Sequence, residues 1–195
     1  MDDFLNRLPD TLTGPGRRFF RLWSEWRRGR KLPELRDVDL AAMGDLARSR
    51  MLFDIRNRHD MRIVMAGETL REWLGVDLTG ANYLDLTLPE YRETRARLTL
   101  EQVLQPCGVM LYYCLRYPNG AVRPIEFVGA PVCADGEDVP GFILASGTQL
   151  GPAISDGAPP DPDSYRIATG MRFIDLGYGV PPANPNIPFE QAALQ

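Results

Sequence analysis

Residues 107–148 read CGVMLYYCLRYPNGAVRPIEFVGAPVCADGEDVPGFILASGT, and this stretch decides the fold. It contains three runs with strand character, at 109–117, 121–132 and 139–148, separated by turn residues. Asn119-Gly120 joins the first two runs, and this pair favours a tight hairpin because both residues tolerate a positive φ. A second Gly-containing turn, DGED at 135–138, joins the next two. The stretch predicts a three-stranded antiparallel meander whose face must be covered by the upstream chain.

Upstream of the meander, the pattern predicts two more strands, at 50–58 and 61–66, and a helix at 88–105. In the first strand Met51, Phe53 and Ile55 alternate with other residues, which predicts one buried face. Thr87 and Glu90 have the spacing of a capping box at the start of the helix. We expect one face of this helix to be buried and its charged residues to stay in water. The buried face would hold Ala96, Leu100, Val103 and Leu104, and the solvated residues would be Arg92, Glu93, Arg95, Arg97 and Glu101.

A further helix is predicted near the N-terminus, where Pro15 can open it and Gly29 can close it. Four apolar side chains lie on a single stripe at i, i+3, i+4 and i+7: Phe19, Leu22, Trp23 and Trp26. The other face is basic, because 17–36 contains eight Arg or Lys and two Glu, a local net charge of +6. Exposed aromatic patches mark interfaces, so we expect self-association through this stripe. The alternative is that the helix covers its own sheet.

Composition indicates an ordinary globular protein with one sizeable core. The chain has 195 residues, 44% of them hydrophobic, and a formal net charge of −4, which gives no global attraction to nucleic acid. No apolar run reaches the roughly 18 residues of a membrane-spanning helix. The start, MDDFL, is acidic and lacks the basic and apolar regions of a signal peptide. We therefore expect a cytoplasmic protein without a transmembrane segment.

The element order and three short motifs resemble a known family. The motifs are LRDVD at 35–39, RIVMAG at 62–67 and GVDLTG at 75–80, and Glu126 is followed by Pro131 in the last-but-one strand. Over about residues 19–150 the chain resembles the small stand-alone PAS domain proteins of proteobacteria. The resemblance implies an α+β fold with a PAS-like five-stranded antiparallel sheet and helices over one face.

This fold divides the chain into four parts: a lead-in at 1–14, the amphipathic helix at 15–31, the PAS-like domain at 32–150 and a C-terminal extension at 151–195. The extension holds eight of the seventeen prolines, which preclude long helices and central strands. Its segment 165–178 is richer in apolar residues and can lie against the domain as an extended segment. We expect the extension to be dispensable for folding.

The resemblance also allows the known PAS cofactors to be tested against the sequence. Haem-binding relatives use a histidine on the helix before the meander, and 88–105 contains none. Flavin-binding photosensors carry a reactive cysteine in an Asn-Cys-Arg-Phe-Leu motif, which this chain lacks. We therefore expect neither haem nor a photoactive flavin. The lone His59 and the dispersed Cys107, Cys114 and Cys133 give no metal-ligand spacing, and the cysteines are expected to be small core hydrophobes.

What remains is an apolar pocket between the sheet and the short helices. Its candidate residues are Trp73, Tyr83, Tyr112, Cys114 and Glu126, in which Tyr and Glu supply the polar anchors of a mostly apolar cavity. The alternative is that the aromatic residues fill the core and that Glu126 pairs with Arg62 across the sheet.

Three functions stay open at this stage. The first is a regulatory PAS module, not an enzyme, that contacts itself as a homodimer or a signalling partner and takes a small ligand. The second is a small-molecule enzyme with Glu126 as acid or base, which a nearby Arg62 would argue against. The third is an adaptor that binds anionic membrane or nucleic acid through the basic N-terminal helix, ranked last because the rest of the chain is acidic.

Overall fold

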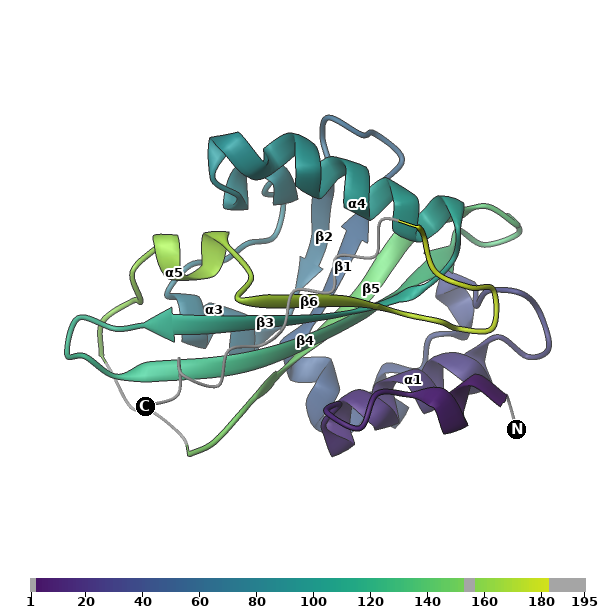
Figure 1. Ribbon diagram of the computed structural model, residues 1–195, viewed down its shortest axis with the longest axis horizontal. Helices are drawn as coiled ribbons and strands as arrows, with labels where there is room; N and C mark the ends of the chain where they lie inside the picture. Colours follow the sequence, from purple (N-terminus) through teal and green to yellow (C-terminus); the bar gives the residue numbers. More distant parts are fainter. Residues whose placement is uncertain (1–2, 153–156, 183–195) are drawn as a thin grey trace.

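The computed structural model describes residues 3–152 and 157–182, which form one antiparallel sheet between two layers of helices (Figure 1). Within these residues the sheet has six strands in the order β2-β1-β5-β4-β3-β6. The strands are β1 Arg50–Asp54, β2 Arg62–Ala66, β3 Gly108–Arg116, β4 Val122–Cys133, β5 Pro140–Gln149 and β6 Gly170–Ile174.

The predicted meander is confirmed, with each strand within a residue or two of its expected bounds. Tyr112 of β3 lies opposite Glu126 of β4, and Ile143 of β5 lies opposite Pro131 of β4. In the first hairpin Gly120 has a φ of +84°, and the Ala121 amide donates to Asn119 Oδ1 at 2.8 Å. The turn departs from the predicted form, because Gly120 takes a positive φ but Asn119 does not and instead accepts the Ala121 amide through its side chain.

A sixth strand corrects the prediction of five. Gly170–Ile174, in the C-terminal extension, pairs antiparallel with β3 from Tyr112↔Gly170 to Gly108↔Ile174. Phe173 and Ile174 are 2% and 3% exposed. The strand fits between Pro162 and Pro181, in the proline-free segment predicted only to lie against the domain. Its pairing and burial argue against the prediction that the extension is dispensable for folding.

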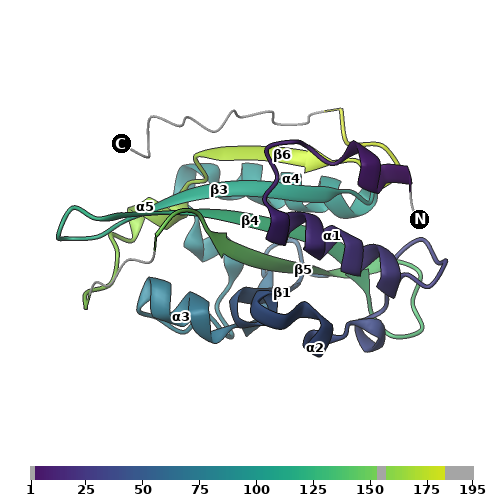
Figure 2. The same ribbon diagram turned by 90° about the horizontal axis from the view of Figure 1, so that it is seen from below.

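Helices cover both faces of the sheet, not one as predicted (Figures 1 and 2). The α-helices are α1 Gly14–Trp26 and α2 Leu40–Met43 on one face, and α3 Glu68–Leu74, α4 Arg92–Leu104 and α5 Asp163–Arg166 on the other. Short 3-10 segments complete the described structure: η1 Asp3–Arg7, η2 Leu35–Asp37, η3 Gly44–Ser49, η4 Tyr83–Leu86 and η5 Pro89–Tyr91. Strands of a sheet covered on both faces are apolar at almost every position, as β3 is.

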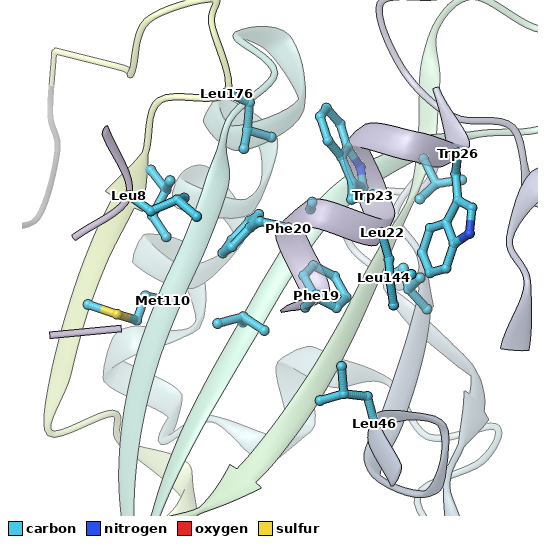
Figure 3. Close-up of a cluster of buried hydrophobic side chains, with 14 of the residues drawn as sticks. Leu8, Phe19, Phe20, Leu22, Trp23, Trp26, Leu46, Met110, Leu144 and Leu176 are labelled. Atoms are coloured by element: carbon cyan, nitrogen blue, oxygen red, sulfur yellow. The ribbon is translucent and has the colours of Figure 1, made fainter. Parts of the chain in front are cut away.

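The first helix packs on its own sheet, which corrects the predicted interface. The Thr13 side chain caps it by accepting from the Gly16 amide at 3.1 Å, and Pro15 occupies its first turn. Its apolar stripe is buried with side chains of β3, β5, η3 and the N-terminal segment (Figure 3). The exposed fractions are 0% for Phe19, 9% for Leu22, 0% for Trp23 and 6% for Trp26.

Helix α4 begins at Arg92, and the three residues before it form the 3-10 turn η5 in place of the predicted first α-helical turn. Its buried residues are Thr99, Gln102 and Val103. Leu104, predicted to be buried, is 83% exposed. The buried face of this helix is therefore more polar than the apolar spacing predicted.

The three cysteines are free and buried, as predicted. None of the helices in the described part of the chain combines the length and the hydrophobicity needed to cross a membrane.

Candidate functional site

A cavity of about 350 Å³ lies between the sheet and the layer formed by α3, α4 and α5. Such a volume is in the range of small-molecule sites in proteins. Strands β1, β3, β4 and β5 form its floor, and the helices and η4 form its walls. Most of the lining side chains are apolar or aromatic, among them Phe53, Trp73, Leu111, Phe127 and Ile143.

Successive side chains of β3 point to opposite faces of the sheet, so only alternate ones face the cavity. Leu111, Tyr113 and Leu115 line it. Met110 and Tyr112 pack on the opposite face, in the core that contains α1. A strand directs successive side chains to opposite faces, so an offset of one residue moves a side chain from the cavity to the other core.

Three polar groups stand out in this apolar lining. The Tyr83 ring lies 4.7 Å from the Phe53 ring, centroid to centroid, and burial raises the pKa of its hydroxyl above the ordinary value of 10.0. The Arg95 guanidinium lies over the Tyr83 ring, with Cζ 4.8 Å from the centroid. Thr87 is 2% exposed, and its hydroxyl has no hydrogen-bond partner among the described residues. These groups are the candidates for orienting a ligand.

The C-terminal extension supplies part of the wall. Tyr165, Arg166, Ile167 and Ala168, at the end of α5 and just beyond it, line the cavity. Arg95 Nη2 of α4 donates to the Arg166 carbonyl oxygen at 3.3 Å, which joins this segment to the helix. The extension is therefore part of the site as well as of the sheet.

The predicted pocket residues separate onto the two faces of the sheet. Trp73 and Tyr83 line the cavity. Tyr112 and Glu126 lie on the α1 face, and Cys114 shares that face because it follows Tyr112 by two residues in β3. The structure thus brings two of the five candidates together and places the other three outside the cavity.

Glu126 belongs to a hydrogen-bonded cluster that anchors the start of α1. Its carboxylate accepts from the Thr13 amide at 3.2 Å, from the Thr13 hydroxyl at 2.5 Å and from the Tyr112 hydroxyl at 3.3 Å. A Cβ on Gly16 would lie 2.6 Å from Glu126 Oε1, so this close approach needs glycine. The predicted pairing with Arg62 is wrong, because Arg62 lies on β2, three strands from β4, and contacts Asp60 at 2.8 Å.

The Glu126 cluster predicts a pH dependence of stability. Burial raises the pKa of Glu126 above its ordinary value of 4.5. The folded state then holds this proton more tightly than the unfolded state, so the contribution is present at pH 4 and is lost as the pH rises through the raised pKa. We expect Glu126→Gln to flatten this decline in the free energy of unfolding. Urea denaturation at pH 5 and pH 8 measures it, with exposed Glu90→Gln as the control. Equal pH slopes in wild type and Glu126→Gln would contradict the prediction.

Sequence reasoning missed Thr87, Arg95 and Tyr113 as site residues. Thr87 was assigned to a capping box and Arg95 to the solvated face of its helix. Tyr113 was passed over for Tyr112. The sequence did contain a signal that Arg95 faces the sheet. Arg95 lies four residues before Thr99 and seven before Gln102, so it shares the buried side of α4 with them.

Several solved structures are similar to the chain. A LOV protein from Rhodobacter sphaeroides is 19% identical over 52% of this chain and 58% of its own, with a TM-score of 0.39. A fungal LOV domain photoreceptor is 20% identical over 68% of this chain and 90% of its own, with a TM-score of 0.40. The chain therefore spans less than two thirds of the Rhodobacter protein. A comparison with curated proteins gives no match.

The prediction that excluded a flavin is withdrawn. Its argument rested on a missing reactive cysteine, which bears on covalent chemistry, whereas non-covalent binding depends on cavity size and polar anchors.

The family is shown by a second comparison. A family model of the PAS domain matches residues 13–128, which is well over half of the chain. The match begins at the Thr13 cap of α1 and ends within β4, so it includes α1 to α4 and most of the residues that line the cavity. It supports a role as a sensory module. On this match, the chain belongs to the PAS domain family.

Proposed function

We propose that this protein is a sensory module that responds to a small ligand bound in the cavity between the sheet and α4. The observation that carries the proposal is the cavity itself, with a volume of about 350 Å³, an apolar lining and a few polar groups. A hydroxyl that is buried without a partner, as in Thr87, is uncommon in folded proteins, and a ligand would satisfy it.

The proposed response passes from the cavity to the surface through its walls. Helix α4 and the segment after α5 both line the cavity, and both reach solvent at Leu104 and Ile167, which are 83% and 42% exposed. A ligand shifts an equilibrium only by its differential affinity for two states. We propose that ligand contact changes the position of the segment after α5, because the hydrogen bond from Arg95 Nη2 of α4 to the Arg166 carbonyl oxygen is long, at 3.3 Å.

Catalysis by Glu126 does not form part of this proposal. The carboxylate is 1% exposed, accepts three hydrogen bonds from Thr13 and Tyr112, and lies on the sheet face away from the cavity. A general acid or base must come within hydrogen-bond reach of its substrate. The arrangement instead supports a structural role for Glu126 at the start of α1.

The membrane and nucleic-acid alternative also loses its support. Interfacial binding of a helix requires an apolar face that is free to enter the membrane, and the stripe of α1 is buried in the core. Part of the basic flank is neutralised by acidic neighbours, since Arg28 lies 3.3 Å from Asp37, and Arg36 lies 2.7 Å from Glu34.

Native mass spectrometry of the full chain tests the proposed function. We expect purified wild type to retain a small molecule, and we expect Ala145→Phe to lose it, because Ala145 lines the cavity and a benzyl group would occupy it. Overpacking costs about 1–3 kcal/mol, so the variant should still fold. Exposed Ala41→Phe is the control and should keep the ligand.

The same experiment includes the absorption spectrum, which identifies a flavin or a haem directly. Two results together would overturn the proposal. The wild-type protein would carry no added mass, and none of the flavins, aromatic acids and fatty acids supplied to it would shift its melting temperature.

A further inference from the structure

The charge of the cavity lining is one-sided. Among its described lining residues the charged side chains are both arginines, Arg95 and Arg166, and no aspartate or glutamate is present. Arg166 Nη1 is paired with Asp163 Oδ1 at 3.2 Å. No carboxylate in residues 3–152 or 157–182 lies within ion-pair distance of Arg95, which makes its guanidinium the unneutralised charge of the site.

Arg95 is held in place by Arg166 and by the neighbouring Tyr83 and Tyr113 side chains, and no carboxylate of the described residues takes up its fork. One donor goes to the Arg166 carbonyl oxygen at 3.3 Å, and the guanidinium lies over the Tyr83 ring. A guanidinium has five N–H donors in a fixed fork that matches a carboxylate in bidentate geometry. A cation that is partly removed from water without a counter-ion is costly, and an anion bound beside it would recover that cost.

Thr87 provides a second, independent observation. Its hydroxyl is buried, lacks a partner in the described chain and lines the same cavity. The Tyr83 and Tyr113 side chains also line it, and both interact with the Arg95 guanidinium. The Tyr83 hydroxyl is protonated at pH 7.5, because its ordinary pKa is 10.0 and burial raises that pKa further, so it has a proton to donate. The polar groups of the site are thus donors suited to an acidic head group, set in walls suited to an apolar body.

We propose that the cavity binds an organic acid, with its carboxylate on Arg95 and its apolar body against Phe53, Trp73 and Phe127. This inference rests on the proposed ligand-binding function and specifies the chemical class of the ligand. A bidentate Arg–carboxylate pair in a partly buried site favours the acid over a neutral analogue of the same shape.

Matched pairs of acids and amides test the assignment. The probes are 2-naphthoate with 2-naphthamide and decanoate with decanamide, titrated into the full chain at pH 7.5 by calorimetry. We expect at least one acid to bind wild type about 10- to 100-fold more tightly than its amide, the size expected for charge-assisted hydrogen bonds. Arg95→Gln should remove that preference and leave affinity for the amide nearly unchanged.

The controls separate a charge effect from a structural one. Arg97→Gln removes a charge from the same helix at an exposed residue that pairs with half-buried Glu101 at 2.7 Å, and this variant should keep the preference for the acid. Arg95→Lys retains the positive charge but loses the forked geometry of the guanidinium donors, so it should bind the acid with intermediate affinity. It serves as the test if Arg95→Gln fails to fold. Thermal unfolding of each variant reports folding.

The titration results test the acid assignment separately from the ligand-binding function. Equal affinity for acid and amide in wild type, or an equal loss of both in Arg95→Gln, overturns the acid assignment and leaves the ligand-binding function standing. Failure of all four probes to bind wild type overturns the acid assignment, and the mass spectrum of the purified protein then decides whether the cavity takes another ligand.

Discussion

Removal of residues 151–195 is expected to abolish cooperative unfolding of the remaining chain. The deletion takes away β6, whose Phe173 and Ile174 are buried, together with buried Leu176. Burial of each such side chain is worth about 1.5–3 kcal/mol, so the three together approach the whole stability of a typical domain, about 5–15 kcal/mol. The unpaired edge of β3 would also be open to pairing with other chains.

Thermal unfolding followed by circular dichroism measures this effect. A chain that ends at Pro182 is the matched control and should unfold as wild type does, since it keeps every described strand. Phe173→Ala tests the same strand with a single change and should cost about 3–5 kcal/mol. A truncated chain with the melting temperature of wild type would show that the pairing of β6 with β3 contributes little.

Trp23→Ala is expected to destabilise the fold by about 3–5 kcal/mol without changing the number of subunits. The indole is fully buried between α1 and the sheet, beside Phe4 at 6.1 Å between ring centroids, and its Nε1 donates to the Pro131 carbonyl oxygen at 2.9 Å. The substitution leaves a cavity and removes the donor of that buried carbonyl.

Sedimentation velocity and urea denaturation, measured on the same samples, distinguish a helix that packs in the core from a helix that forms a dimer interface. Trp23→Phe keeps most of the volume and loses the hydrogen bond, so its cost should be smaller. If Trp23→Ala instead unfolded like wild type and changed a dimer into a monomer, the stripe would be an interface after all.

The sequence predicted the parts of the fold that depend on local chemistry. The Asn119-Gly120 turn defined the hairpin, and the alternation of Met51, Phe53 and Ile55 identified the buried face of β1 and of the residue just beyond it. These three residues are 7%, 7% and 3% exposed. Pro15 placed the start of α1 within one residue. Each of these features is decided within a few neighbouring residues.

The location of the cavity depended on long-range packing that the sequence does not specify. Seven consecutive residues of β3, from Val109 to Leu115, are apolar or aromatic, so both faces of the strand are suited to burial and neither is distinguished. Tyr112 and Tyr113 are chemically identical candidates, and only the register of β3 between β4 and β6 decides which one faces the cavity. Strand β6 was not predicted, because a run of five residues says little about its partner strand.

The position of β6 has a consequence for the order in which the chain becomes structured. Strand β1 pairs with β5, about ninety residues later, and β3 waits for Gly170–Ile174, about sixty residues later. Folding slows as contacts join residues that are farther apart in sequence, because loop closure must precede the contact. During synthesis, the edge of β3 therefore stays unpaired until the ribosome has released residue 174. This interval is when the nascent chain is most exposed to aggregation and to chaperone binding.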